Sequence, residues 1–123
     1  MTTHRKRTEK ITVYQKPTCT TCRQVHAALV AAGVDFDAVD YFVEPLSAVT
    51  IRRLLAKMGC GAHEILRTKD PLYKELGLDE RDLSDAELIE LMAKHPGLLQ
   101  RPIVEKGDRA ILARPAERIR EIF

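Results

Sequence analysis

The sequence predicts a single α/β domain in which a β-α-β unit and a β-β-α unit share one mixed four-stranded sheet, with several helices inserted between the two units. Short β-branched and apolar segments lie near both ends of the 123-residue chain. The middle of the chain carries capped helical patterns instead. Two cysteines three positions apart stand between the first predicted strand and the first predicted helix.

The β-α-β unit comes first. "ITVYQ" at 11–15 is β-branched and aromatic and is predicted to form a short buried strand. Thr18 or Thr20 is expected to cap a helix that runs from about Thr20 to Ala32. "DFDAVDYF" at 35–42 alternates well enough for a second strand. A helix between two strands predicts a parallel, right-handed connection.

Helices dominate the middle of the chain. In "EPLSAVTIRRLLAKMG", Ser47 is expected to be the N-cap. "DPLYKELGL" at 70–78 and "SDAELIELMAKHPG" at 84–97 are predicted to be two more helices. In the latter, Ser84 and Glu87 have the spacing of a capping box.

The β-β-α unit closes the chain. Residues 101–115 have the pattern of a hairpin with "EKGD" as its turn, and Pro115 is expected to begin a final helix. This order of elements, with a strand, a CxxC pair and a helix at its start, is that of a thioredoxin-like fold with a helical insertion. We therefore expect one thioredoxin-like domain over residues 11–123, preceded by a basic, flexible tail at 1–10.

Composition narrows the classes of protein to consider. Apolar residues make up 45% and charged residues 31% of the chain, which is typical of a globular protein. No apolar run approaches the roughly 20 residues of a membrane span, and the N-terminus lacks the apolar core of a secretory signal, so we expect a cytoplasmic protein without a membrane partner. Beyond residue 10 the charges nearly balance, at 16 Lys and Arg against 17 Asp and Glu, which disfavours direct nucleic-acid binding.

The chain has three cysteines, Cys19, Cys22 and Cys60, an odd number that favours redox, catalytic or metal chemistry over a disulfide framework. Cys19 lies at a helix start, where unpaired N–H groups and the helix dipole favour a thiolate, so it is predicted to be the nucleophile. Cys22 follows on the same helix face, close enough to form a disulfide with Cys19. Arg23 adds positive charge, and we count it with the substrate-binding residues.

Two other interpretations of the cysteines stay open. The pair can simply pack, as buried free cysteines often do. It can also join Cys60 and His63, which have zinc-ligand spacing, although 37 residues separate the two pairs; we expect no metal. Cys60 has no assigned role, and His26 and His95 are expected to be structural or solvent-facing.

Three arginines stand where a predicted helix or strand ends: Arg67 in "EILRTKD", Arg101 in "LLQRPIV" and Arg114 in "ILARPAE". A guanidinium donates two hydrogen bonds at once and always stays charged, which suits a tetrahedral oxyanion. With "ITVYQKPTCTTCR" and "LMAKHPGLLQRPIV", these segments make the chain resemble the arsenate reductase family, the ArsC/Spx group of thioredoxin-like proteins, over about residues 11–123.

The resemblance implies specific roles. The nucleophilic cysteine of the family matches Cys19, its three oxyanion-binding arginines match Arg67, Arg101 and Arg114, and the bond before Pro102 is expected to be cis. The activity implied is reduction of arsenate to arsenite in arsenic detoxification. A second thiol then releases arsenite; in the glutathione-using enzymes it comes from outside, and here Cys22 is a candidate for it. We expect no bound cofactor, and the resemblance implies that glutathione, glutaredoxin or thioredoxin supplies the electrons.

The resemblance also implies an alternative function. The CxxC pair is typical of the Spx branch, whose members are redox-sensing transcriptional regulators that bind RNA polymerase. Arg67 and Arg114 favour the arsenate reductase branch, because Spx-type proteins do not generally keep both. A reductase that acts on a different substrate through the same site is a third alternative.

Overall fold

The structure is a computed structural model that describes residues 10–123. The predicted basic tail, apart from Lys10, lies outside the described residues. The chain divides into two compact units, one containing the residues up to Val39 together with Arg101–Phe123 and the other containing Asp40–Gln100. Each unit is described by itself, and the assignment of 11–123 to one domain stays a prediction.

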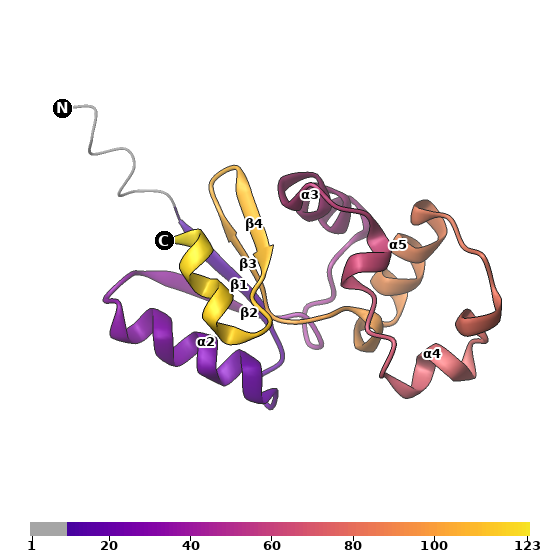
Figure 1. The fold of residues 1–123 in the computed structure, drawn as a ribbon, viewed down its shortest axis with the longest axis horizontal. Coiled ribbons are helices and arrows are strands. Elements are labelled where there is room, and N and C mark those ends of the chain that lie inside the picture. Colours follow the sequence, from indigo (N-terminus) through magenta and orange to yellow (C-terminus); the bar gives the residue numbers. More distant parts are fainter. Residues whose placement is uncertain (1–9) are drawn as a thin grey trace. The chain divides into compact units, whose positions relative to one another are not determined.

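A four-stranded sheet organises the first unit (Figure 1). Its strands lie in the order β2-β1-β3-β4, with bounds Phe36–Asp40, Ile11–Gln15, Ile103–Lys106 and Arg109–Leu112. β1 and β3 are antiparallel with Val13 opposite Val104, and β3 and β4 are antiparallel with Val104 opposite Ile111. The predicted mixed sheet of a thioredoxin-like α/β fold is therefore confirmed.

Two helices contribute to the core of this unit. Helix α2 (Thr20–Ala31) and the 3₁₀ helix η4 (Ala116–Ile122) contact each other. The shared core consists of eight buried side chains: Ile11, Val13, Val25, Leu29, Val104, Ala113, Ile119 and Ile122. Because α2 is anchored through Val25 and Leu29, its N-terminal end is held at the carboxyl end of β1.

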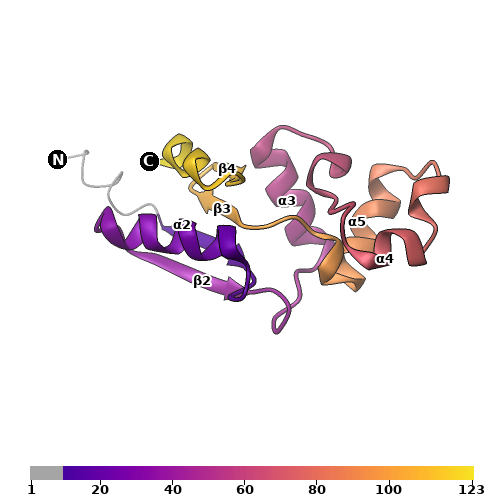
Figure 2. The ribbon, with the colours of Figure 1, turned by 60° about the horizontal axis from the view of Figure 1, so that its bottom comes forward.

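The second unit is helical (Figure 2). It contains α3 (Ala48–Met58), α4 (Pro71–Glu75) and α5 (Asp85–Lys94), with short 3₁₀ helices at Ala62–Ile65, Leu78–Glu80 and Pro96–Leu98. α3 contacts α5, and their buried faces include Ile51, Leu54, Leu88 and Met92. None of the helices in residues 10–123 has the length and apolar character that a membrane span requires.

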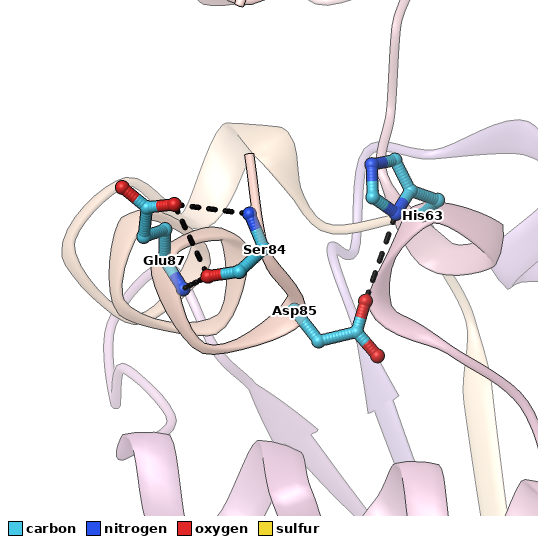
Figure 3. A network of polar contacts seen from close by, with 4 residues as sticks. All are labelled: His63, Ser84, Asp85 and Glu87. Atoms are coloured by element: carbon cyan, nitrogen blue, oxygen red, sulfur yellow. Dashed lines mark hydrogen bonds and ion pairs between the residues drawn. The ribbon is translucent and has the colours of Figure 1, made fainter. Parts of the chain in front are cut away.

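Two predicted helix caps are present. The Ser47 hydroxyl accepts a hydrogen bond from the Thr50 N–H at 3.1 Å. Ser84 and Glu87 form the predicted capping box: the Glu87 N–H donates to Ser84 Oγ at 3.2 Å, and the Ser84 N–H donates to Glu87 Oε1 at 3.0 Å (Figure 3). Both caps satisfy N–H groups that a helix start otherwise leaves without partners.

Several predicted boundaries were wrong. The cap of α2 is Cys19, not Thr18 or Thr20. The helix predicted over 84–97 ends at Lys94, because Pro96 has no N–H and restricts the residue before it. Gly77, with φ 68°, ends the helical stretch predicted at 70–78.

The closing hairpin also differs from its prediction. Only Gly107 and Asp108 form its turn, because Glu105 and Lys106 pair with β4 instead of turning. The final helix is of the 3₁₀ type.

Candidate active site

Cys19 is the N-cap of α2. Its backbone is extended, with φ −77° and ψ 127°, and its Sγ accepts a hydrogen bond from the Cys22 N–H at 3.3 Å. The sulfur is therefore held against the first turn of the helix, where the partial positive charge of the helix dipole is concentrated. The Cys19 thiol thus caps α2, a role that was predicted for the hydroxyl of Thr18 or Thr20.

The surroundings of Cys19 favour its thiolate. Partial burial raises the pKa of the Cys19 thiol, but hydrogen bonds from Cys22 and Arg114 and the charge of Arg101 together outweigh burial, so the pKa lies below its ordinary value. Arg114 Nη1 lies 4.0 Å from Cys19 Sγ. Thiolate character and half-exposure together are the properties of a nucleophilic cysteine.

Cys22 has the opposite character. Its side chain is fully buried, and burial raises the pKa of its thiol to about 12. A hydrogen bond with the Lys16 backbone lowers this pKa, whereas the neighbouring Cys19 raises it. Both thiols are free. The surroundings thus favour the thiolate form at Cys19 and the protonated thiol at Cys22.

Two of the predicted arginines meet beside Cys19. Arg101 lies just before β3, separated from it by Pro102, and Arg114 lies just after β4, separated from it by Ala113. These antiparallel strands pair Ile103 with Leu112, so the residues flanking the hairpin are neighbours. Arg114 Nη1 donates to the Arg101 carbonyl oxygen at 3.1 Å. Arg101 is buried, with 7% of its surface exposed.

The peptide bonds Arg101–Pro102 and Arg114–Pro115 are both cis. The resemblance led us to expect the first of these, whereas nothing in the sequence pointed to the second.

The other two predicted arginines have different surroundings. Arg67 belongs to the helical unit, where its Nη1 donates to Gln100 Oε1 at 3.3 Å and its N–H donates to the Leu98 carbonyl at 2.7 Å. Arg23 is exposed in the first turns of α2. The structure thus brings together Cys19, Cys22, Arg101 and Arg114, and the substrate-binding roles of Arg67 and Arg23 stay predictions.

Sequence reasoning missed a hollow beside Cys22. It has a volume of about 340 Å³ and is lined by Gln15, Pro17, Cys22, Arg23 and His26; we call it the Cys22 hollow. Gln15 Oε1 is buried there without a hydrogen-bond partner in the part of the chain that is described. The signal in the sequence was the spacing of Cys22 and His26, which are four apart and therefore share a helix face.

Cys60 lies in the helical unit among carboxylates. Burial, followed by the charges of Glu64 and Asp85, raises the pKa of its thiol. His63 Nδ1 lies 3.6 Å from Asp85 Oδ1 (Figure 3). Across residues 10–123, no three His, Cys, Asp or Glu side chains come together as a metal site requires.

Known proteins resemble this chain over most of its length. Residues 14–122 match the model of the ArsC family. An arsenate reductase of Haemophilus influenzae is 36% identical over 114 residues, which cover 92% of this chain and 98% of that protein. The global transcriptional regulator Spx of Streptococcus pyogenes is 36% identical over 94 residues, which cover 76% of this chain and 70% of that protein. The solved arsenate reductase of Vibrio cholerae superposes with a TM-score of 0.88 at 34% identity, covering 94% of this chain and 98% of that one.

Proposed function

Because the chain belongs to the ArsC family, we propose that it is an arsenate reductase, an oxidoreductase that converts arsenate to arsenite with electrons from a thiol compound. The observation that carries this proposal is the placement of Cys19 Sγ at the start of α2, 4.0 Å from Arg114 Nη1. A nucleophilic thiolate beside a guanidinium suits a substrate that is both an anion and an electrophile.

The arginines bind the oxyanion in this proposal. Arg101 and Arg114 donate hydrogen bonds to arsenate oxygens and neutralise their charge as Cys19 attacks. Arg67 and Arg23 are assigned to the same substrate-binding set, the former from the resemblance and the latter from its place at the start of α2. A guanidinium keeps its charge throughout, so it holds the anion without exchanging protons with it.

The chemistry then takes two steps. The Cys19 thiolate forms a bond to arsenic, and one arsenate oxygen leaves as water after accepting two protons. Cys22 next attacks Cys19 Sγ: the sulfur–sulfur bond forms, the sulfur–arsenic bond breaks, and its electron pair stays on arsenic, which leaves as arsenite. The Cys19–Cys22 disulfide is finally reduced by glutathione, glutaredoxin or thioredoxin, and these steps call for no bound cofactor.

Turnover of arsenate tests the proposal. Arsenate-dependent oxidation of reduced glutaredoxin, thioredoxin or glutathione is measured through NADPH consumption in the matching coupled system. We expect turnover that Cys19→Ser abolishes and that Cys60→Ser, a matched control in the helical unit, leaves intact. Absence of turnover with all three donors would refute the proposal, as would a Cys19→Ser variant with full activity.

Two observations favour a second function: the similarity to Spx, and a CxxC pair whose two thiols differ in exposure. In this alternative the Cys19–Cys22 disulfide is a switch that controls binding to RNA polymerase. Pulldown with the C-terminal domain of the polymerase α-subunit, under reducing and oxidising conditions, separates the two functions. Redox-dependent capture without arsenate turnover would favour the regulator.

A further inference from the structure

The Cys22 hollow is lined by the buried residue whose thiol has to give up a proton. In the proposed reaction Cys22 attacks Cys19 Sγ, and only a thiolate is nucleophilic enough to do so. Burial raises the pKa of Cys22 to about 12, so this thiol stays protonated at neutral pH. The resolving step therefore needs a group that takes the proton as the sulfur–sulfur bond forms.

We propose that His26, which lines the Cys22 hollow one helical turn beyond Cys22, accepts the Cys22 proton during disulfide formation and returns it during disulfide reduction. This inference rests on the proposed function for its biological setting. Imidazole exchanges protons near neutral pH and is the side chain most often used as a general base.

The geometry places His26 for this role. Residues four apart on a helix are neighbours on one face, and both Cys22 and His26 line the hollow between α2 and the end of β1. The imidazole contacts the Phe36 ring of β2 edge to face, with centroids 5.2 Å apart and an angle of 82°. This contact holds the ring against Phe36 of β2, while the His26 side chain stays exposed to solvent.

Charged and polar groups face Cys22 and His26 from the elements around the hollow. Cys22 is faced by the charges of Cys19 and Arg101 and by the Lys16 backbone, and Arg23 on α2 lines the hollow as a fixed positive charge. From β2 the neighbour of His26 is the uncharged ring of Phe36. Gln15, at the end of β1, also lines the hollow, and its buried Oε1 has no hydrogen-bond partner among the described residues.

The proton and the electrons balance in both directions. During resolution, Cys22 Sγ gives its proton to a His26 nitrogen and its electron pair to the new bond with Cys19 Sγ, and the group on Cys19 leaves with the former bonding pair. During reduction, a donor thiolate attacks Cys19, the partly exposed sulfur, and Cys22 leaves the disulfide. The imidazolium then protonates it, which matters because a thiolate of high pKa is a poor leaving group.

An arsenate-free assay isolates the resolving step. In a Cys60→Ser background only two thiols remain, and an aromatic disulfide such as 5,5′-dithiobis(2-nitrobenzoate) reports each of them. Cys19 attacks the probe and releases one coloured thiolate; Cys22 then attacks the mixed disulfide and releases the second. Stopped-flow absorbance at several pH values gives the rate of each phase.

His26→Phe is the informative variant, because it keeps an aromatic ring against Phe36 and removes the nitrogens. We expect the first phase to be unchanged and the second to slow about 100-fold near pH 7, a typical effect of losing a general base. The deficit should shrink as the pH rises, since hydroxide then removes the Cys22 proton. Imidazole added to a His26→Ala variant should restore the second phase specifically.

The proposal fails if the second phase of His26→Phe stays within about twofold of the parent at neutral pH, where a general base contributes most. It also fails if both phases slow equally, because that pattern indicates a structural effect. His63→Gln, in the helical unit, is the matched control and should alter neither phase. Since no arsenate is present, a protein that fails as an arsenate reductase still gives a decisive answer about His26.

Discussion

Replacing Arg114 with Ala is expected to raise the pKa of Cys19, because Arg114 Nη1 lies 4.0 Å from Cys19 Sγ and donates to it. At this distance, two unit charges interact by about 4 kcal/mol at an effective dielectric constant of 20 and by about 1 kcal/mol in bulk water. Cys19 is half-exposed, so solvent screens the pair and the lower end of that range applies. A loss of about 1.4 kcal/mol in the free energy that favours a thiolate raises the pKa of the thiol by about one unit.

The rate of alkylation measures this pKa directly. Iodoacetamide reacts with the thiolate, so its rate plotted against pH rises through the pKa of Cys19. In a Cys60→Ser background Cys22 does not interfere, because its own pKa of about 12 and its burial keep it unreactive. Arg114→Gln keeps a hydrogen-bond donor and removes the charge, which separates the two contributions.

The sign of the effect is fixed by the pKa shift. A thiol whose pKa is lowered in the folded protein is a thiolate over a wider pH range, so the rising limb of the profile should move to higher pH when Arg114 is removed. Arg118→Ala, which removes an exposed pair with Glu121, should leave it in place. A profile that does not move in Arg114→Ala would refute the role assigned to this guanidinium.

Three further predictions concern other parts of the structure. Tyr14→Phe should lower the free energy of unfolding by about 1–3 kcal/mol in urea titrations, because Tyr14 Oη donates at 2.7 Å to the buried Glu105 carboxylate; an unchanged midpoint would contradict this. Ser84→Ala should cost about 1 kcal/mol of stability by the same measurement, since it removes the capping box of α5, and Ser84→Asp should recover most of the loss. Cys22→Ser should prevent the intramolecular disulfide, so that mass spectrometry after oxidation finds Cys19 joined to an added small thiol instead; an unmodified Cys19 would argue against its nucleophilic role.

Local signals in the sequence predicted the parts of the fold that depend on neighbouring residues. Ser47 and the Ser84–Glu87 pair could be identified as caps because a cap is decided within four residues of the chain. Cys19 was predicted to be at a helix start, but the choice of capping atom fell on a threonine. That choice depends on side-chain orientation, since Thr18, Cys19 and Thr20 all carry an acceptor in the right part of the chain.

The candidate site depends on contacts that a sequence does not display. Arg101 and Arg114 were selected by chemistry and resemblance, but their hydrogen bond exists because β3 and β4 pair with Ile103 opposite Leu112. The Cys22 hollow arises between α2 and the end of β1, so no single segment encodes it. His26 was expected to be structural or solvent-facing; its side chain is exposed, and it also lines the Cys22 hollow.

Because the Cys19 sulfur caps α2, a backbone hydrogen bond contributes to the relative stability of the reduced and oxidised forms of the cysteine pair. A thiolate accepts the Cys22 N–H more strongly than a sulfur already bonded to arsenic or to another sulfur, so the first turn of α2 holds the reduced form more firmly than the oxidised form. Every stabilisation of the reduced state makes the disulfide a stronger oxidant. The first turn of α2 therefore contributes part of the free energy that favours reduction of the Cys19–Cys22 disulfide.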